Sequence, residues 1–183
     1  MPWGSFKSAM AGVMSNHTFG NSMEGWAAKL TSEYDMAVKT GKTNVTGIVL
    51  SKGQNSAMQG LLISELHSQQ QSKTKTLIEI CGPAIIAYWT GASISLIPPA
   101  IPCIPTILNV SVVGAPVTNA GSWTPIPNAP CNNVNIWLDE FILCAKQHML
   151  TVSGLHNTIS LYPGSPPFPA PCVQPWSGYT VPG

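Results

Sequence analysis

The segment NSMEGWAAKLTSEYDMAVKTG, residues 21–41, is the stretch that most clearly sets the fold. Its apolar residues recur every three or four positions, as they do on one face of an amphipathic helix. They are Met23, Trp26, Ala27, Leu30, Tyr34 and Val38. Asn21 or Ser22 can cap the start of such a helix, and Gly41 can end it. The pattern predicts a core helix over residues 21–40.

Further helices are predicted on both sides of this segment. QNSAMQGLLISELHSQQQS predicts a helix over residues 55–72. The segment 134–152 predicts another, with its acidic residues early and its basic residues late, as the helix dipole favours. The apolar run that begins at Leu77 predicts a buried helix, which Gly82 and Pro83 bend or interrupt.

The remaining segments predict extended structure. Residues 42–53 predict a short strand or loop bounded by glycine, and ILNVSVVG at 107–114 predicts a strand. Fifteen of the 17 prolines lie from Pro98 onward, which favours extended arms. We therefore expect a mainly α, small helical domain with extended proline-rich arms and little β structure. Its parts would be a helical half at 1–97, a proline-rich connector at 98–133, and a helix with a proline-rich tail at 134–183, packed as one domain.

The chain is unusually poor in charge. Charged residues make up 8% of it, against roughly 25% in a typical globular domain. The net charge is +1, there is no Arg, and seven of the eight Lys lie before residue 81. Because nucleic-acid binding draws on Lys and Arg clustered on one surface, this composition argues against a nucleic-acid partner. Few charges also leave a free chain prone to association, so we expect other chains to cover much of the surface.

No catalytic signature stands out. The closest approach to a nucleophile turn is VSGLH, with Ser153 and His156, and a helix end capped by Gly154 explains it better. Asp139 and Glu140 are adjacent, so on a helix they point in different directions and cannot act as a paired acid and base. A phosphate-cradling glycine loop is missing as well. We expect no enzymatic activity and no small-molecule substrate; a hydrolase or a lectin-like module would need a polar cluster that the sequence does not supply.

Metal binding has one candidate pair. Cys144 and His148 lie four residues apart on the predicted helix, and Cys131, His156 or Cys172 could in principle complete a site. The chain has no Cys-x-x-Cys pair, and cysteine is often simply a small buried residue. We therefore expect neither a metal nor another cofactor. The N-terminal residues do not resemble a secretory signal, which favours free thiols and a protein that is not secreted.

Aromatic residues are the candidates for partner contact. Two similar motifs, AYWTG at 87–91 and QPWSGYTVPG at 174–183, each place a Trp beside a hydroxyl residue and a Gly. They are a duplicated structural unit, a binding platform or a coincidence of composition, and the low charge favours two similar joints of one structural unit over a ligand site. Because Trp and Tyr are enriched at protein interfaces, we assign interface contacts to five aromatic residues. These residues are Trp89, Trp123, Phe168, Trp176 and Tyr179.

Four segments together resemble small virion structural proteins of contractile-tailed, T4-like phages and cyanophages. They are LTSEYDMAVKTG (30–41), AYWTGA (87–92), HNTISLYPG (156–164) and PWSGYTVPG (175–183). The resemblance implies a virion subunit, made in the host cytoplasm, that packs with copies of itself and with other virion proteins. It implies a tail, baseplate or neck component rather than a head decoration.

A membrane-interacting protein is the alternative, with the apolar segment 77–98 as the contact. Pro83, Gly91 and Pro98 interrupt that run, and a membrane-spanning helix needs about 20 mostly apolar residues. A membrane partner is therefore the less favoured expectation.

Overall fold

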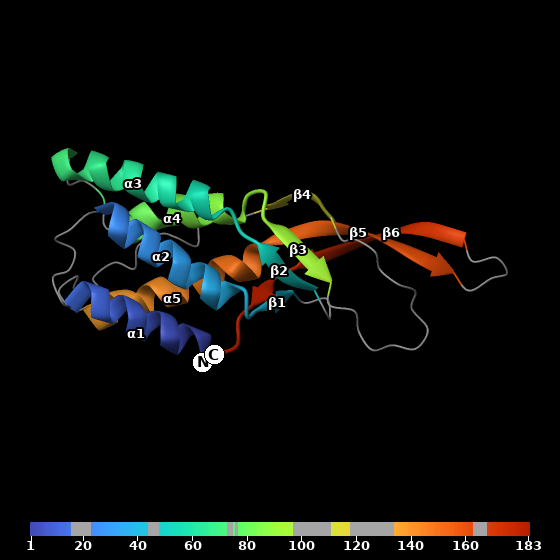
Figure 1. The fold of residues 1–183 in the computed structure, drawn as a ribbon, viewed down its shortest axis with the longest axis horizontal. Coiled ribbons are helices and arrows are strands. Elements are labelled where there is room, and N and C mark those ends of the chain that lie inside the picture. Colours follow the sequence, from blue (N-terminus) through green and yellow to red (C-terminus); the bar gives the residue numbers. More distant parts are fainter. Residues whose placement is uncertain are drawn as a thin grey trace.

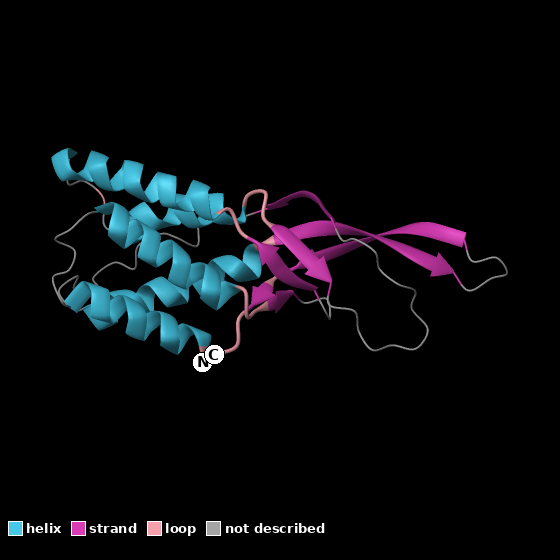
Figure 2. Cartoon of the chain, viewed as in Figure 1, coloured by secondary structure: helices cyan, strands magenta, loops and turns pink. Residues whose placement is uncertain are grey.

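The computed structural model describes eight parts of the chain. They are residues 1–15, 23–43, 48–72, 75, 77–96, 111–117, 134–162 and 168–183. The described helices gather at one end of the molecule and the longer strands extend from the other (Figures 1 and 2). The helices are α1 (Pro2–Ser15), α2 (Met23–Val38), α3 (Asn55–Ser72), α4 (Leu77–Trp89) and α5 (Val134–Thr151). The prediction of a mainly α domain is confirmed.

Helix α1 has no counterpart in the sequence-based prediction. Its start carries Pro2, which suits the first turn because proline lacks the N–H that would stay unbonded there. Trp3, Phe6 and Met10 follow at helical spacing, and all three are buried. The ring of Phe6 stacks on that of Phe141 with centroids 5.3 Å apart, which joins α1 to α5. These apolar residues were the signal for the helix.

Helix α4 continues through its proline. Pro83 lies inside the helix, so the interruption that the sequence allowed does not occur. The helix ends at Trp89 and a turn of Thr90 and Gly91 follows, in which Gly91 has a φ of 77°, a left-handed conformation that glycine adopts without steric cost. Ile78, Ile80 and Ile85 of α4 are buried against the other helices.

The described strands form three small antiparallel sheets. β1 (Lys42–Thr43) pairs with β7 (Tyr179–Thr180), and β2 (Ile48–Lys52) pairs with β3 (Ser93–Leu96). The third sheet has the order β4-β5-β6, and its strands are β4 (Ser111–Val117), β5 (Ser153–Tyr162) and β6 (Phe168–Ser177). β1 and β2 fall within the predicted segment 42–53, and β4 overlaps the predicted strand 107–114.

The proline-rich tail is more ordered than a simple extended arm. β5 and β6 pair in continuous register from Ser153↔Ser177 to Tyr162↔Phe168. Gly154, which we expected to cap a helix, instead lies in β5 opposite Trp176. The connector expected at 98–133 contains β4, and the rest of that segment lies outside the described residues.

One hydrophobic core joins the helices to the end of the chain. Its largest fully buried side chains come from α1, α2, α3, α4, α5 and β7. They include Phe6, Tyr34, Met58, Tyr88, Trp89, Phe141 and Tyr179. Helices distant in sequence therefore share a core with a two-residue strand near residue 180.

Candidate functional site

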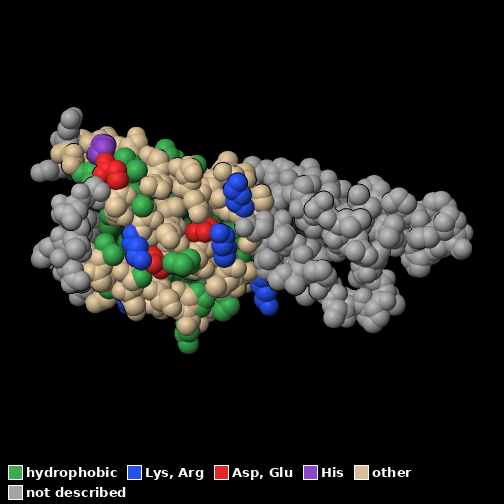
Figure 3. All heavy atoms as spheres, viewed as in Figure 1, with side chains coloured by type: hydrophobic (Ala, Val, Ile, Leu, Met, Phe, Trp, Pro, Cys, Tyr) green, Lys and Arg blue, Asp and Glu red, His purple; other side chains and the backbone are tan. Residues whose placement is uncertain are grey.

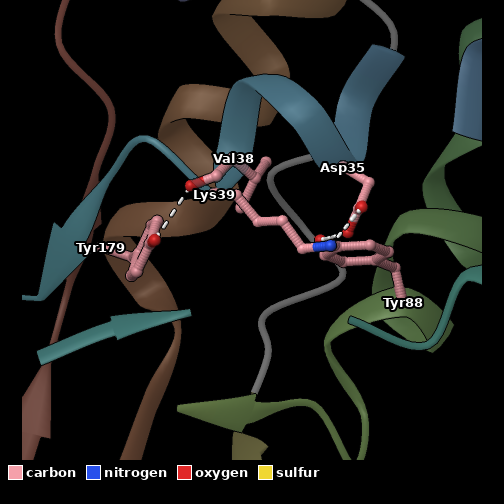
Figure 4. Close-up of polar contacts among 5 residues, drawn as sticks. All are labelled: Asp35, Val38, Lys39, Tyr88 and Tyr179. Atoms are coloured by element: carbon pink, nitrogen blue, oxygen red, sulfur yellow. Dashed lines mark hydrogen bonds and ion pairs between the residues drawn. The ribbon is translucent and has the colours of Figure 1, made fainter. Parts of the chain in front are cut away.

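Tyr179 anchors the C-terminal segment in the helical core. Its hydroxyl donates a hydrogen bond of 2.9 Å to the Val38 carbonyl (Figure 4). It also accepts one of 3.2 Å from the Leu50 N–H. Burial raises the pKa of Tyr179 to about 12, so the hydroxyl keeps its proton. The anchor fixes the chain directly after β6, and it therefore holds the base of the β5–β6 hairpin.

A second buried tyrosine joins α4 to α2. The Tyr88 hydroxyl donates to Asp35 Oδ1 at 2.7 Å, and Lys39 Nζ lies 2.6 Å from Asp35 Oδ2 (Figure 4). Burial, with the hydrogen bond to Asp35 second, raises the pKa of Tyr88 well above its usual range. Both carboxylate oxygens of the buried Asp35 therefore have a partner, as buried polar atoms in proteins usually do.

The two Trp-Gly motifs of the sequence meet in this core. The Trp89 indole N–H donates to the Tyr34 hydroxyl at 2.9 Å, and the Trp89 and Tyr179 rings pack edge to face with centroids 5.1 Å apart. Gly91 and Gly178 both have a positive φ, 77° and 76°. The two motifs are thus in direct contact through Trp89 and Tyr179, which the sequence did not predict.

The five aromatic residues assigned to an interface lie in different parts of the chain, and the structure describes them to different extents. Trp89 and Tyr179 are completely buried within the chain's own core, where both side chains make hydrogen bonds and ring contacts. In this structure neither offers surface to a partner, which corrects their assignment. Phe168 and Trp176 belong to β6, where only the backbone is described, and Trp123 lies outside the described residues.

Cys144 and His148 face the core from α5. Both side chains are buried, and burial lowers the pKa of His148 to about 4. Burial, with the charge of Glu140 second, raises the pKa of the Cys144 thiol. Within the described ranges no three His, Cys, Asp or Glu side chains gather as a metal site would require. Of the other candidates, His156 and Cys172 have only a described backbone, and Cys131 falls outside.

A shallow hollow of about 360 Å³ lies between the start of α1 and the C-terminal half of α2. Its lining is largely apolar, with Met1 88% and Met36 52% exposed at its rim. Its acidic group, Glu33, is paired with Lys29 at 2.6 Å. Its hydroxyl groups, on Ser5 and Thr40, donate to the backbone carbonyls of Met1 and Ala37, so the polar side chains around the hollow are engaged within the chain itself.

Exposed apolar side chains follow one line along α5. Ile136, Leu143 and Leu150 are 39%, 45% and 59% exposed, and they are spaced seven residues apart. Seven residues make almost two helical turns, so the three lie nearly in a row. We call this row the α5 stripe. The sequence analysis assigned α5 to the core and did not single out its outer face.

Charges on the described surface are few and largely paired. Lys7 lies 2.6 Å from Asp139, and Lys75 lies 2.7 Å from Glu65. On the face in Figure 3, basic and acidic side chains form separate small spots instead of a stripe of one sign. This surface is unlike the basic patch of a nucleic-acid-binding protein.

The apolar segment considered for a membrane is mostly core. Helix α4 has only 13 residues, and its apolar side chains pack against other helices. No helix in the described part of the chain is long and apolar enough to cross a membrane. The structure therefore lends the membrane alternative no support.

No protein-family model, curated protein or solved structure matches this chain. The functional proposal consequently rests on the residues and geometry of the chain itself, and on the resemblance carried by its four short segments.

Proposed function

We propose that the chain is a structural subunit of a tailed-bacteriophage virion that assembles in multiple copies. Its partners are copies of itself and other virion proteins, and it acts by packing, without catalysis. The tail, baseplate or neck is favoured over the head. The β5–β6 hairpin and the outer faces of the helices are the contact elements.

The hairpin is the observation that carries the proposal. Strands β5 and β6 each have ten residues and extend beyond the helical end of the molecule (Figure 1). At a strand rise of about 3.3 Å per residue, each spans roughly 33 Å. The Tyr179 anchor ties the base of this hairpin to the core. A projecting element with a fixed base adds contact area for neighbours without enlarging the core.

Prolines at alternate positions protect the outer edge of β6. Strand order places β6 at the edge of its sheet, and Pro169, Pro171 and Pro175 lie at every second or fourth position along it. Successive residues of a strand direct their backbone groups to opposite edges, so the three prolines share one edge. Because proline has no N–H to donate to the ladder with β5, we infer that this is the edge away from β5. This edge lacks three donors and resists pairing with a further strand. Uncontrolled strand addition is thereby disfavoured, while the faces of the two paired strands remain for specific contacts.

The low charge supports the same function. An interface core is depleted in charged residues, and charged residues make up only 8% of this chain. From residue 81 onward the charged side chains are Asp139, Glu140 and Lys146. All three lie in α5, so the hairpin carries no Asp, Glu, Lys or Arg that would have to be desolvated when subunits pack.

Shortening the hairpin tests the proposal. Thr158 and Cys172 are directly opposite each other, so residues 159–171 can be replaced by Asn-Gly, which favours a two-residue turn. This change retains the Tyr179 anchor, whereas deleting the whole tail would remove Tyr179 from the core. In a phage strain that carries both versions of the gene, we expect the shortened chain to enter particles at least ten times less often than the full chain.

The control is the fold of the shortened chain. Its circular dichroism and melting temperature should stay close to those of the full chain, because the core residues are unchanged. Equal incorporation of a folded, shortened chain would overturn the role of the hairpin.

A further inference from the structure

Helix α5 is apolar on two sides. One side packs Trp137, Phe141 and Met149 into the core. The other side carries the α5 stripe, whose exposed fractions rise from 39% at Ile136 to 59% at Leu150. A surface helix normally turns one apolar face to the core and a polar face to water. An outer apolar row gives a helix a surface that can pack against another helix; at a spacing of seven residues it supplies one of the two apolar positions that each heptad of a coiled coil uses.

The charges beside the stripe indicate which helix fits. Asp139 lies on one flank before Leu143, and Lys146 lies on the same flank after it. Glu140 and Gln147 occupy the opposite flank in the same way. If a second α5 runs antiparallel about a two-fold axis at Leu143, each flank meets its own reversed copy. Asp139 then faces Lys146 of the other copy, and Glu140 faces Gln147.

We propose that the α5 stripe docks on the α5 stripe of a second copy of this chain, antiparallel, with Leu143 at the two-fold axis. Ile136 then packs against Leu150 of the other copy at both ends. Asp139 already contacts Lys7, yet its side chain is 63% exposed and a carboxylate accepts several hydrogen bonds. A parallel pair would instead bring four acidic side chains together at one level, so like charges disfavour it.

The pair forms a weak interface on its own. An 18-residue helix is about 27 Å long, and one helix face covers less than the roughly 800 Å² per partner of a standard stable interface. Association of the isolated chain should therefore depend on concentration. The inference deepens the proposed self-assembly, since it names one surface that joins two copies, but the stripe and its flanking charges do not depend on a virion context.

Site-directed crosslinking tests the geometry. In full-length chains with Cys103, Cys131 and Cys172 changed to Ser, we expect Leu143→Cys alone to give a disulfide-linked dimer under mild oxidation. Ile136→Cys alone should give none. A mixture of Ile136→Cys and Leu150→Cys chains should crosslink. Efficient crosslinking of Ile136→Cys to itself would mean a parallel pair, and no crosslinking of any variant would overturn the docking of a second copy here.

Sedimentation of full-length chains measures the association of two copies independently of crosslinking. Leu143→Glu places two carboxylates at the two-fold axis, so we expect the dimer dissociation constant to rise at least tenfold. Leu61→Glu is the matched control, because Leu61 is a 40% exposed leucine on α3, and its association should equal that of the unchanged chain. A wild-type chain that stays monomeric at every concentration overturns this inference. Whether the chain is incorporated into particles is tested separately, by the hairpin experiment.

Discussion

Single residues decide how the tyrosine-rich core closes. A Cβ at Gly53 would overlap the ring of Tyr88, and a Cβ at Gly41 would overlap both the ring of Tyr179 and the carbonyl of Thr180. Neither glycine has a positive φ, so they are needed for space and not for backbone conformation. The sequence identified Gly41 only as a helix stop, since spacing cannot indicate which ring will lie against a glycine.

Replacing Gly53 with Ala should destabilise the fold. The added methyl group forces the Tyr88 ring away from its position and strains the hydrogen bond to Asp35, at a cost of about 1–3 kcal/mol in the free energy of unfolding. Gly60→Ala is the control, because nothing lies within 4 Å of its Cβ position and Ala favours the interior of α3. Urea denaturation measures both variants; a Gly53→Ala chain as stable as wild type would refute the crowding.

His148 should make stability depend on pH. Burial lowers its pKa from 6.5 in the unfolded chain to about 4 in the folded one. Between these values the unfolded chain binds a proton that the folded chain does not, so the free energy of unfolding falls as pH falls from about 6.5 to 4. The loss amounts to about 3 kcal/mol by pH 4.

The measurement is urea denaturation at several pH values between 7 and 4 for wild type and His148→Gln. The variant should lose much less stability across this window, because Gln does not titrate. Parallel curves for wild type and His148→Gln would show that His148 is not buried in its neutral form.

At the scale of elements, the short strand β7 depends on one side chain. Replacing Tyr179 with Phe removes the hydroxyl and leaves the Val38 carbonyl and the Leu50 N–H without this partner. We expect a loss of about 2 kcal/mol in the free energy of unfolding. Amide exchange should also quicken at Thr180 before it does in the helices, since β7 would detach first. Unchanged exchange at Thr180 would contradict the anchor.

The sequence predicted some of the helices more accurately than others. The periodic apolar pattern located α2, α3 and α5 to within about two residues at most ends. It missed α1, which has the same kind of pattern, and it left the path of the chain through Pro83 open. Proline inside a helix costs stability locally, but burial of the isoleucines around it outweighs that cost.

The structure of the proline-rich tail could be predicted only in part from its local sequence. Prolines every two or four residues in β6 predict extended backbone, and the structure has extended backbone there. They do not indicate a partner strand, because pairing of β6 with β5 depends on the turn and on register. Likewise, the burial of Trp89 and Tyr179 depends on the contact between two distant motifs, which no local pattern encodes.

At the scale of the whole molecule, a charge-poor chain combines a helical core with a projecting hairpin. Composition alone predicted that other chains cover its surface, and the structure adds candidate contact elements in the β5–β6 hairpin and the α5 stripe. Each can be altered without touching the buried tyrosines, so assembly and folding can be tested separately.

Quantitative mass spectrometry of purified phage particles tests the central claim most directly. With isotope-labelled peptides of this chain and of a component of known copy number as standards, we expect the chain at a fixed number of copies per particle, above one and constant between preparations. The chain should remain after density-gradient purification and high-salt washing. A chain that is abundant in the infected-cell lysate but absent from the washed particles would contradict its role as a virion subunit.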